Sequence, residues 1–287
     1  MKIEKLALIL LLLLPGFTGA IAQSFSFGMC TDVHYADIPS NGTRKYRQSI
    51  DKLTQCVDSM NQRKVSFLIE LGDFKDMPVT PDSLAALVFL RKIESVFSRF
   101  RGERYHVLGN HDEDCISKEQ FCSVVHNSHI ATNRTWYSFQ KNGYQFVVLD
   151  ACFDSTGHAY NKGNFIWSDT NIPQTELKWL SGELKIAKLP VIVFVHQPLS
   201  GSIKVSVGNR EAVRTILEKS HKVKCVFQGH EHAGGYALIN GIHYYTLKGM
   251  IEGDFPESNS FAIVTLTKDE ILIHGYGKAV SLQLPIN

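Results

Sequence analysis

Apolar runs and amphipathic segments alternate along most of the chain. The short apolar runs predict strands over 24–31, 66–71, 105–108, 190–196 and 223–228. Segments with apolar positions at helical spacing lie between them and predict helices over 45–63, 82–100, 174–187 and 210–220. Repeated strand and helix units of this kind favour parallel strands with helices on the outer faces of the sheet.

Hairpins are predicted where Asn-Gly separates two strand-like runs. The paired runs are 135–140 with 144–150, around Asn142-Gly143, and 236–239 with 242–247, around Asn240-Gly241. Two further runs, 261–267 and 271–275, follow near the end of the chain. A chain that begins with β-α units and ends in hairpins predicts mixed sheets with helices outside, an α/β sandwich.

The first 22 residues differ from the rest. Lys2 and Lys5 precede an unbroken apolar run from Leu6 to Leu14, and Ala20-Ile21-Ala22 fits a cleavage site for a signal peptidase. The alternative is an uncleaved membrane anchor, but nine apolar residues are fewer than the roughly 20 that a spanning helix needs. We therefore expect a signal peptide over 1–22 and a single domain over 23–287, exported to the periplasm or secreted, with no further membrane span.

Charge argues against a polyanionic partner. The formal net charge is +2, and the densest basic cluster is Arg44, Lys45 and Arg47. Nucleic-acid binding requires many phosphate contacts, so no nucleic-acid surface is expected. The oligomeric state cannot be inferred from these features.

Six cysteines lie between residues 30 and 225. Export permits disulfides, and Cys115 with Cys122 is a candidate pair. Buried free thiols are the preferred interpretation, because several of the cysteines lie in apolar runs.

Asp, Asn and His residues follow five of the predicted strands. They are Asp32 and His34, then Asp73 and Asp76, then Asn110, His111 and Asp112, then His196, and finally His230 and His232. Ligands of open α/β sheets bind beyond the carboxyl ends of the strands, so these side chains are expected to share one site. Carboxylate, amide and imidazole donors without thiolate suit Mn, Fe or Zn.

The ordered motifs Asp32-Val-His34, Gly72-Asp73-x-x-Asp76, Gly109-Asn110-His111-Asp112, His196 and Gly229-His230-x-His232 resemble the calcineurin-like metallophosphoesterase superfamily. The resemblance implies a four-layer αββα fold, in which two mixed sheets pack as a sandwich flanked by helices. It also implies two divalent metal ions. Asp32, His34, Asp73 and His232 would hold one ion. Asp73, Asn110, His196 and His230 would hold the other.

The segments 31–37 and 42–49 further resemble the manganese-dependent ADP-ribose/CDP-alcohol diphosphatase subfamily. That resemblance implies that Arg44 or Arg47 binds a substrate phosphate. The alternative is a solvated helix N-terminus. Basic charge at that end opposes the helix dipole, which slightly favours a functional role.

The expected activity is hydrolysis of small phosphoesters by a hydroxide held between the two ions. His111 is the candidate to protonate the leaving oxygen, and Asp112 is the candidate to orient the His111 ring. A nucleoside-diphosphate pyrophosphatase is the more specific alternative. A noncatalytic metal-binding module on the same fold is a further alternative. A missing ligand would favour it, but none is missing. A protein phosphatase is disfavoured by the predicted export.

Overall fold

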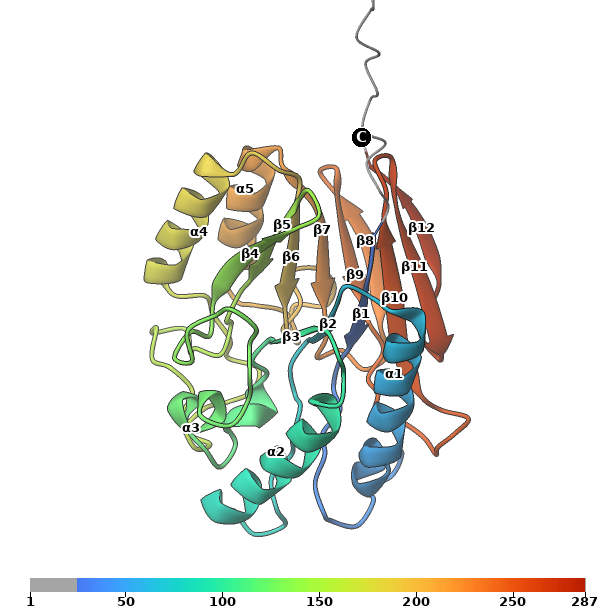
Figure 1. The fold of residues 1–287 in the computed structure, drawn as a ribbon. Coiled ribbons are helices and arrows are strands. Elements are labelled where there is room, and N and C mark those ends of the chain that lie inside the picture. Colours follow the sequence, from blue (N-terminus) through green and yellow to red (C-terminus); the bar gives the residue numbers. More distant parts are fainter. Residues whose placement is uncertain (1–24, 287) are drawn as a thin grey trace, which may run out of the picture.

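The structure, a computed structural model, describes residues 25–286, which form two six-stranded mixed sheets (Figure 1). In spatial order, the first sheet contains β12 (Leu282–Pro285), β11 (Glu270–Gly277), β10 (Ser260–Leu266), β1 (Phe25–Cys30), β2 (Phe67–Glu70) and β3 (Glu103–His106). The second contains β4 (Tyr137–Lys141), β5 (Tyr144–Val148), β6 (Val191–Val195), β7 (Val223–Gln228), β9 (Ile242–Thr246) and β8 (Gly235–Ile239). The predicted signal peptide at 1–22 lies outside the described residues.

Parallel strands form one side of the first sheet and the middle of the second, and they fix where their loops emerge. β1, β2 and β3 run parallel, with Gly28 opposite Leu68 and Ile69 opposite Tyr105. β5, β6, β7 and β9 are likewise parallel. The antiparallel strands, which include both predicted Asn-Gly hairpins, complete the two sheets. Loops that follow the parallel strands of one sheet therefore leave at the same edge.

An aromatic core fills the space between the sheets. Phe27 stacks on Phe67 with ring centroids 4.7 Å apart and meets the edges of Phe146 and Phe194 across the interface at 5.8 Å. All four side chains are fully buried. Burial of a side chain of this size stabilises the fold by about 1.5–3 kcal/mol, so this interface fixes the two sheets face to face.

Helices cover the outer faces of both sheets. α1 (Ser49–Arg63) and α2 (Ser83–Phe97) share a hydrophobic cluster with the first sheet, and α4 (Gln174–Ile186) and α5 (Arg210–Ser220) share one with the second (Figure 1). Asp82 caps α2, since its carboxylate accepts the backbone N–H groups of Leu84 and Ala85. The predicted two-sheet sandwich flanked by helices is confirmed.

The turns and cysteines follow the sequence closely. Asn142 and Gly143 have φ values of 47° and 82°, and Asn240 and Gly241 have 49° and 81°, as a two-residue hairpin turn requires. All six cysteines are buried free thiols, so the candidate pair Cys115–Cys122 is not formed. Within residues 25–286 no helix has the length and apolar content needed to cross a membrane.

Three short elements were not predicted. They are β12, α3 (Lys118–Cys122) and the 3₁₀ turn η2 (Asn110–Glu113). β12 is a four-residue edge strand that ends in proline and pairs only with β11. None of the three contains an apolar run of the kind that predicted the other strands.

Candidate active site

Loops that follow β1, β2, β3, β6 and β7 bring all seven predicted metal ligands together. Asp32 and His34 follow β1, and Asp73 follows β2. Asn110 begins η2 after β3, His196 follows β6, and His230 and His232 follow β7. The shared site expected from the strand ends is therefore present as a cluster of side chains.

One group of donors gathers around Asp32. The Oδ1 atom of Asp32 lies 3.3 Å from Nε2 of His232 and 3.7 Å from Nε2 of His34. The two imidazole Nε2 atoms are 3.2 Å apart. The three donor atoms lie within 4.8 Å of one another, close enough to hold a single ion.

A second group gathers around Asp73. Its Oδ2 atom lies 3.1 Å from Nε2 of His196, which is 3.3 Å from Nδ1 of His230. The same Oδ2 atom lies 3.5 Å from Nε2 of His34 in the first group. Asp73 is thus placed between the groups, where a carboxylate can bridge two ions.

The backbone at these ligands is unusual. Asp32, His34, Asp73 and His230 have φ values of 51°, 47°, 58° and 67°, in the left-handed region. Asp and His enter this region more readily than most residues, but each such position still stores strain. Four strained residues in one cluster indicate that the fold holds these side chains for function.

Two glycines permit the loops to approach one another. A Cβ atom at Gly109 would collide with the backbone nitrogen of Asp73, and one at Gly229 would collide with the Thr31 hydroxyl. Both glycines directly precede a predicted ligand, Asn110 and His230. A side chain at either position would separate two ligand-bearing loops.

A second layer of hydrogen bonds orients the imidazoles. Nδ1 of His34 pairs with Asp76 Oδ2 at 3.1 Å, and Nδ1 of His232 pairs with Glu252 Oε1 at 2.7 Å. Nδ1 of His196 donates to the backbone carbonyl of Leu71 at 2.8 Å. These partners leave Nε2 of all three rings facing the cluster, which is the arrangement that metal-binding histidines need.

Burial and neighbouring charges shift the pKa values of the clustered histidines. Burial alone would lower the pKa of His196 and His232, but the carboxylates of Asp73 and Asp32 raise each to about 9. Burial and the neighbouring His196 lower the pKa of His230 to about 3. Since ligation requires neutral imidazoles, ion binding at this site releases protons.

The donor set fits two divalent ions. Asp32 Oδ1 and Asn110 Oδ1 are buried and find no hydrogen-bond partner among residues 25–286. An unsatisfied buried acceptor costs about 1–3 kcal/mol, which a cation would remove. Carboxylate, amide and imidazole donors without thiolate match Mn, Fe or Zn, as the sequence predicted.

His111 lies at the edge of the cluster. Its ring is 28% exposed and its centroid is 4.7 Å from that of His34. Nδ1 of His111 pairs with Asp114 Oδ2 at 2.7 Å. Burial would lower the pKa of His111, but Asp73 and Asp114 raise it well above its ordinary value. A protonated ring facing the site is suited to donate a proton.

The role predicted for Asp112 is wrong. Its carboxylate accepts the backbone N–H groups of Asp73, Phe74, Lys75 and Gly109 at 2.9–3.2 Å. It therefore fixes the Asp73 loop against η2, and Asp114 and Asp76 contact the His111 ring instead. Burial and the charge of Asp73 raise the pKa of Asp112 to about 6.

The two candidate phosphate-binding arginines are placed differently. Arg44 lines the cavity of about 580 Å³ that contains Asp73, Asn110 and His111. The Arg47 guanidinium instead pairs with the Asp37 carboxylate, and both side chains are mostly exposed. Of the two, Arg44 can reach a ligand in the cavity.

Several residues at the site carried no predicted role. Asp76 stood in the Gly72-Asp73-x-x-Asp76 motif, whose spacing could have indicated a supporting carboxylate. Glu252 and Trp167 lie in segments without a motif. Trp167 lines the same cavity as Arg44, and its ring centroid is 5.8 Å from that of His230. No local sequence signal marks these two residues, because only the tertiary fold brings them to the ligands.

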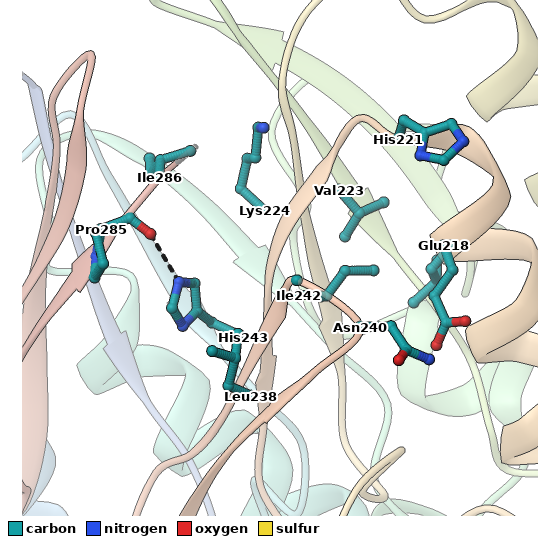
Figure 2. Close-up of a pocket in the computed structure, with 12 residues that line it drawn as sticks. Glu218, His221, Val223, Lys224, Leu238, Asn240, Ile242, His243, Pro285 and Ile286 are labelled. Carbon is teal, nitrogen blue, oxygen red and sulfur yellow. Dashed lines mark hydrogen bonds between the residues drawn. The ribbon is translucent and has the colours of Figure 1, made fainter.

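Another cavity, of about 290 Å³, lies at the opposite end of β7 (Figure 2). It is lined by Val223 at the start of that strand, by Glu218 and His221 near the end of α5, and by His243 of β9. His243 Nε2 pairs with the Pro285 carbonyl at 2.9 Å (Figure 2). The groups of donor atoms close enough to share an ion, among residues 25–286, all lie at the other end of the strands.

Comparison with known proteins agrees with this geometry. The profile of the calcineurin-like phosphoesterase family matches residues 25–234. A manganese-dependent ADP-ribose/CDP-alcohol diphosphatase of Oryza sativa subsp. japonica is 28% identical over 91% of this chain and 94% of its own. A protein of the same name from Arabidopsis thaliana is 28% identical over 88% of this chain and 94% of its own.

The fold also has a solved counterpart. The crystal structure of a dimetal phosphatase from Danio rerio superposes with a TM-score of 0.80, at 23% identity, over 92% of this chain and 99% of that one. The matched family region contains every predicted metal ligand. The chain belongs to the calcineurin-like phosphoesterase family and is a metal-dependent phosphoric ester hydrolase with a site for two divalent ions.

Proposed function

We propose that the chain is a manganese-dependent diphosphatase that cleaves nucleoside-diphosphate-linked compounds such as ADP-ribose and CDP-alcohols. Two relatives that cover most of the chain carry that activity in their names. The observation that carries the proposal is Arg44, whose guanidinium lines the same cavity as the ligands Asp73 and Asn110. A diphosphate has two charged phosphates. The metal ions bind the phosphate that is attacked, and a further cation is needed for the other.

Each residue then has a defined task. When bound, the two ions supply a hydroxide nucleophile near neutral pH and offset the charge of the attacked phosphate. Arg44 binds the second phosphate through its guanidinium. His111 gives a proton from Nε2 to the leaving phosphate oxygen, because its Nδ1 is held by Asp114.

Product analysis with a matched pair of variants tests the proposal. The manganese-loaded chain is incubated with ADP-ribose, a CDP-alcohol and p-nitrophenyl phosphate, and AMP and CMP are measured by chromatography. We expect Arg44→Gln to raise the KM for ADP-ribose about tenfold, the effect of losing one or two charge-assisted hydrogen bonds. Arg47→Gln is the control, because its side chain is paired with Asp37 outside the cavity. Hydrolysis of the monoester alone would reject the diphosphatase assignment.

We further propose that the chain is exported through a signal peptide over 1–22. The support is the sequence of that segment, with two lysines before a nine-residue apolar run and a small-residue cleavage site. Amino-terminal sequencing of the protein made in its native host should begin at Gln23. Recovery of the uncleaved chain beginning at Met1 would contradict export.

A further inference from the structure

A groove of about 420 Å³ adjoins the metal cavity. The two cavities share Val205 and Glu231 in their walls. Glu231 lies between the ligands His230 and His232, and Val205 lies in the loop after β6. Since cavities of about 300–1,000 Å³ enclose ordinary small-molecule ligands, a substrate that binds the metals can extend past Val205 and Glu231 into this groove.

The polar lining of the groove matches a ligand with hydroxyl groups. The hydroxyl oxygens of Ser200 and Thr246 both accept from the Gln228 amide, at 3.1 and 3.0 Å. No acceptor for either hydroxyl hydrogen is found among residues 25–286, so each can donate to a ligand. The Glu231 carboxylate can accept from a ligand hydroxyl, as acidic residues do at ribose.

The charge of the groove argues against a second phosphate there. Glu231 contributes negative charge, and no Lys, Arg or His side chain lines the groove within the described part of the chain. Arg44 instead lines the metal cavity. A diphosphate therefore stays in the metal cavity, and a neutral group enters the groove.

We propose that this groove is the subsite for the sugar or polyol end of a nucleoside-diphosphate-linked substrate. The inference rests on the proposed diphosphatase function. It assigns a binding place to the sugar or polyol that is attached to the diphosphate. Ser200, Thr246 and Glu231 hydrogen-bond the hydroxyl groups of that sugar or polyol.

Gly235 offers a way to fill the groove without disturbing the fold. It lies at the start of β8, its φ is not left-handed, and a Cβ atom there meets no atom within 4 Å. Gly235→Phe places a bulky ring in the groove, and Gly235→Leu places a smaller branched side chain there. Gly182 in α4 meets nothing within 4 Å either, so Gly182→Phe is the matched control away from the groove.

The experiment measures binding instead of turnover. Calorimetry gives the Kd of the manganese-loaded chain for two non-hydrolysable ligands, the α,β-methylene analogue of ADP-ribose and that of ADP, which lacks the second ribose. We expect Gly235→Phe to weaken the ADP-ribose analogue by about tenfold, the equivalent of one or two hydrogen bonds, with a smaller effect for Gly235→Leu. Binding of the ADP analogue should change less than about twofold, and Gly182→Phe should change neither Kd.

Three results would overturn the subsite. They are equal weakening of both analogues by Gly235→Phe, no weakening of either, and failure of the unaltered chain to bind the ADP-ribose analogue. Failure of the proposed function gives a different result. In that case the unaltered chain binds the analogues with the expected discrimination but releases no AMP from ADP-ribose.

Discussion

Two buried clusters in this protein both combine carboxylates with imidazoles but differ in what they can do. One is the metal cluster. The other, here called the His106 cluster, consists of Glu70, Glu94 and His106. His106 Nε2 lies 3.2 Å from Glu94 Oε2, and Nδ1 lies 3.6 Å from Glu70 Oε2. Both clusters join carboxylates to imidazoles next to the same strands.

The two clusters differ in whether their donor atoms reach a cavity or are enclosed by other side chains. Glu70 and His106 are the last residues of β2 and β3, and the His106 ring packs against Phe74 and Phe97 with centroids 5.0 and 4.7 Å apart. The His106 side chain is enclosed by these rings, whereas Asp73, Asn110 and His230 line a cavity of about 580 Å³. Residue type alone thus does not make a site. Convergence of donor atoms on a cavity does.

The largest expected effect is the loss of activity when the metal cluster is altered. Asp73→Asn removes the carboxylate between the two ion positions and should lower kcat/KM by at least about 10⁴-fold. Asp58→Asn, an exposed carboxylate paired with Arg99, is the control and should leave activity unchanged. Steady-state kinetics with ADP-ribose measures kcat/KM for both variants. Substantial activity in Asp73→Asn would show that Asp73 does not hold the ions.

The next effect concerns the proton donor. His111→Ala should lower kcat by about 10²–10⁴-fold while the manganese content per chain stays the same. The structural reason is that His111 lines the metal cavity while its Nδ1 is held by the Asp114 carboxylate. Elemental analysis beside kinetics checks both parts. Loss of manganese together with activity would make His111 a ligand instead of an acid.

A smaller effect is expected at the second layer of the metal cluster. Glu252→Gln weakens the partner of His232 Nδ1 and should weaken manganese binding by about 10–100-fold. Glu257→Gln, in the same exposed segment, is the control. Titration of the metal-free variants with Mn²⁺ measures the difference. Equal affinity in both variants would remove Glu252 from the site.

The smallest effect on activity is expected at the His106 cluster, where stability should change instead. Burial lowers the pKa of His106, but Glu94 and Glu70 raise it to about 9. This contribution is complete below the unfolded-state pKa of about 6.5 and is lost as the pH rises through about 9. The free energy of unfolding of the manganese-saturated chain should therefore fall by on the order of 2 kcal/mol between these values.

His106→Gln should flatten this pH dependence and leave kcat at neutral pH within about threefold. His129→Gln replaces an exposed histidine and should keep the slope of the unaltered chain. Denaturant unfolding at several pH values supplies the comparison. If the free energy of unfolding of His106→Gln kept the same pH dependence, other groups would be responsible for it.

The sequence located the ligands because each lies just after a strand, and strand ends can be read from local apolar runs. It could not distinguish Asp112 from Asp114, since the direction of a side chain on η2 depends on which loop it faces. Asp112 turns back to the Asp73 loop, whereas Asp114 reaches the His111 ring. Glu252 follows His232 by twenty residues and reaches it only through the return of the chain after β9.

The requirement for two metal ions can be tested by measuring metal stoichiometry together with activity. The chain is stripped with a chelator, dialysed, and titrated with Mn²⁺ while bound metal and phosphoester hydrolysis are followed. We expect no activity in the stripped chain, binding of two ions per chain, and recovery of activity as the second ion binds. Full activity without metal, or saturation at a single ion, would contradict this requirement.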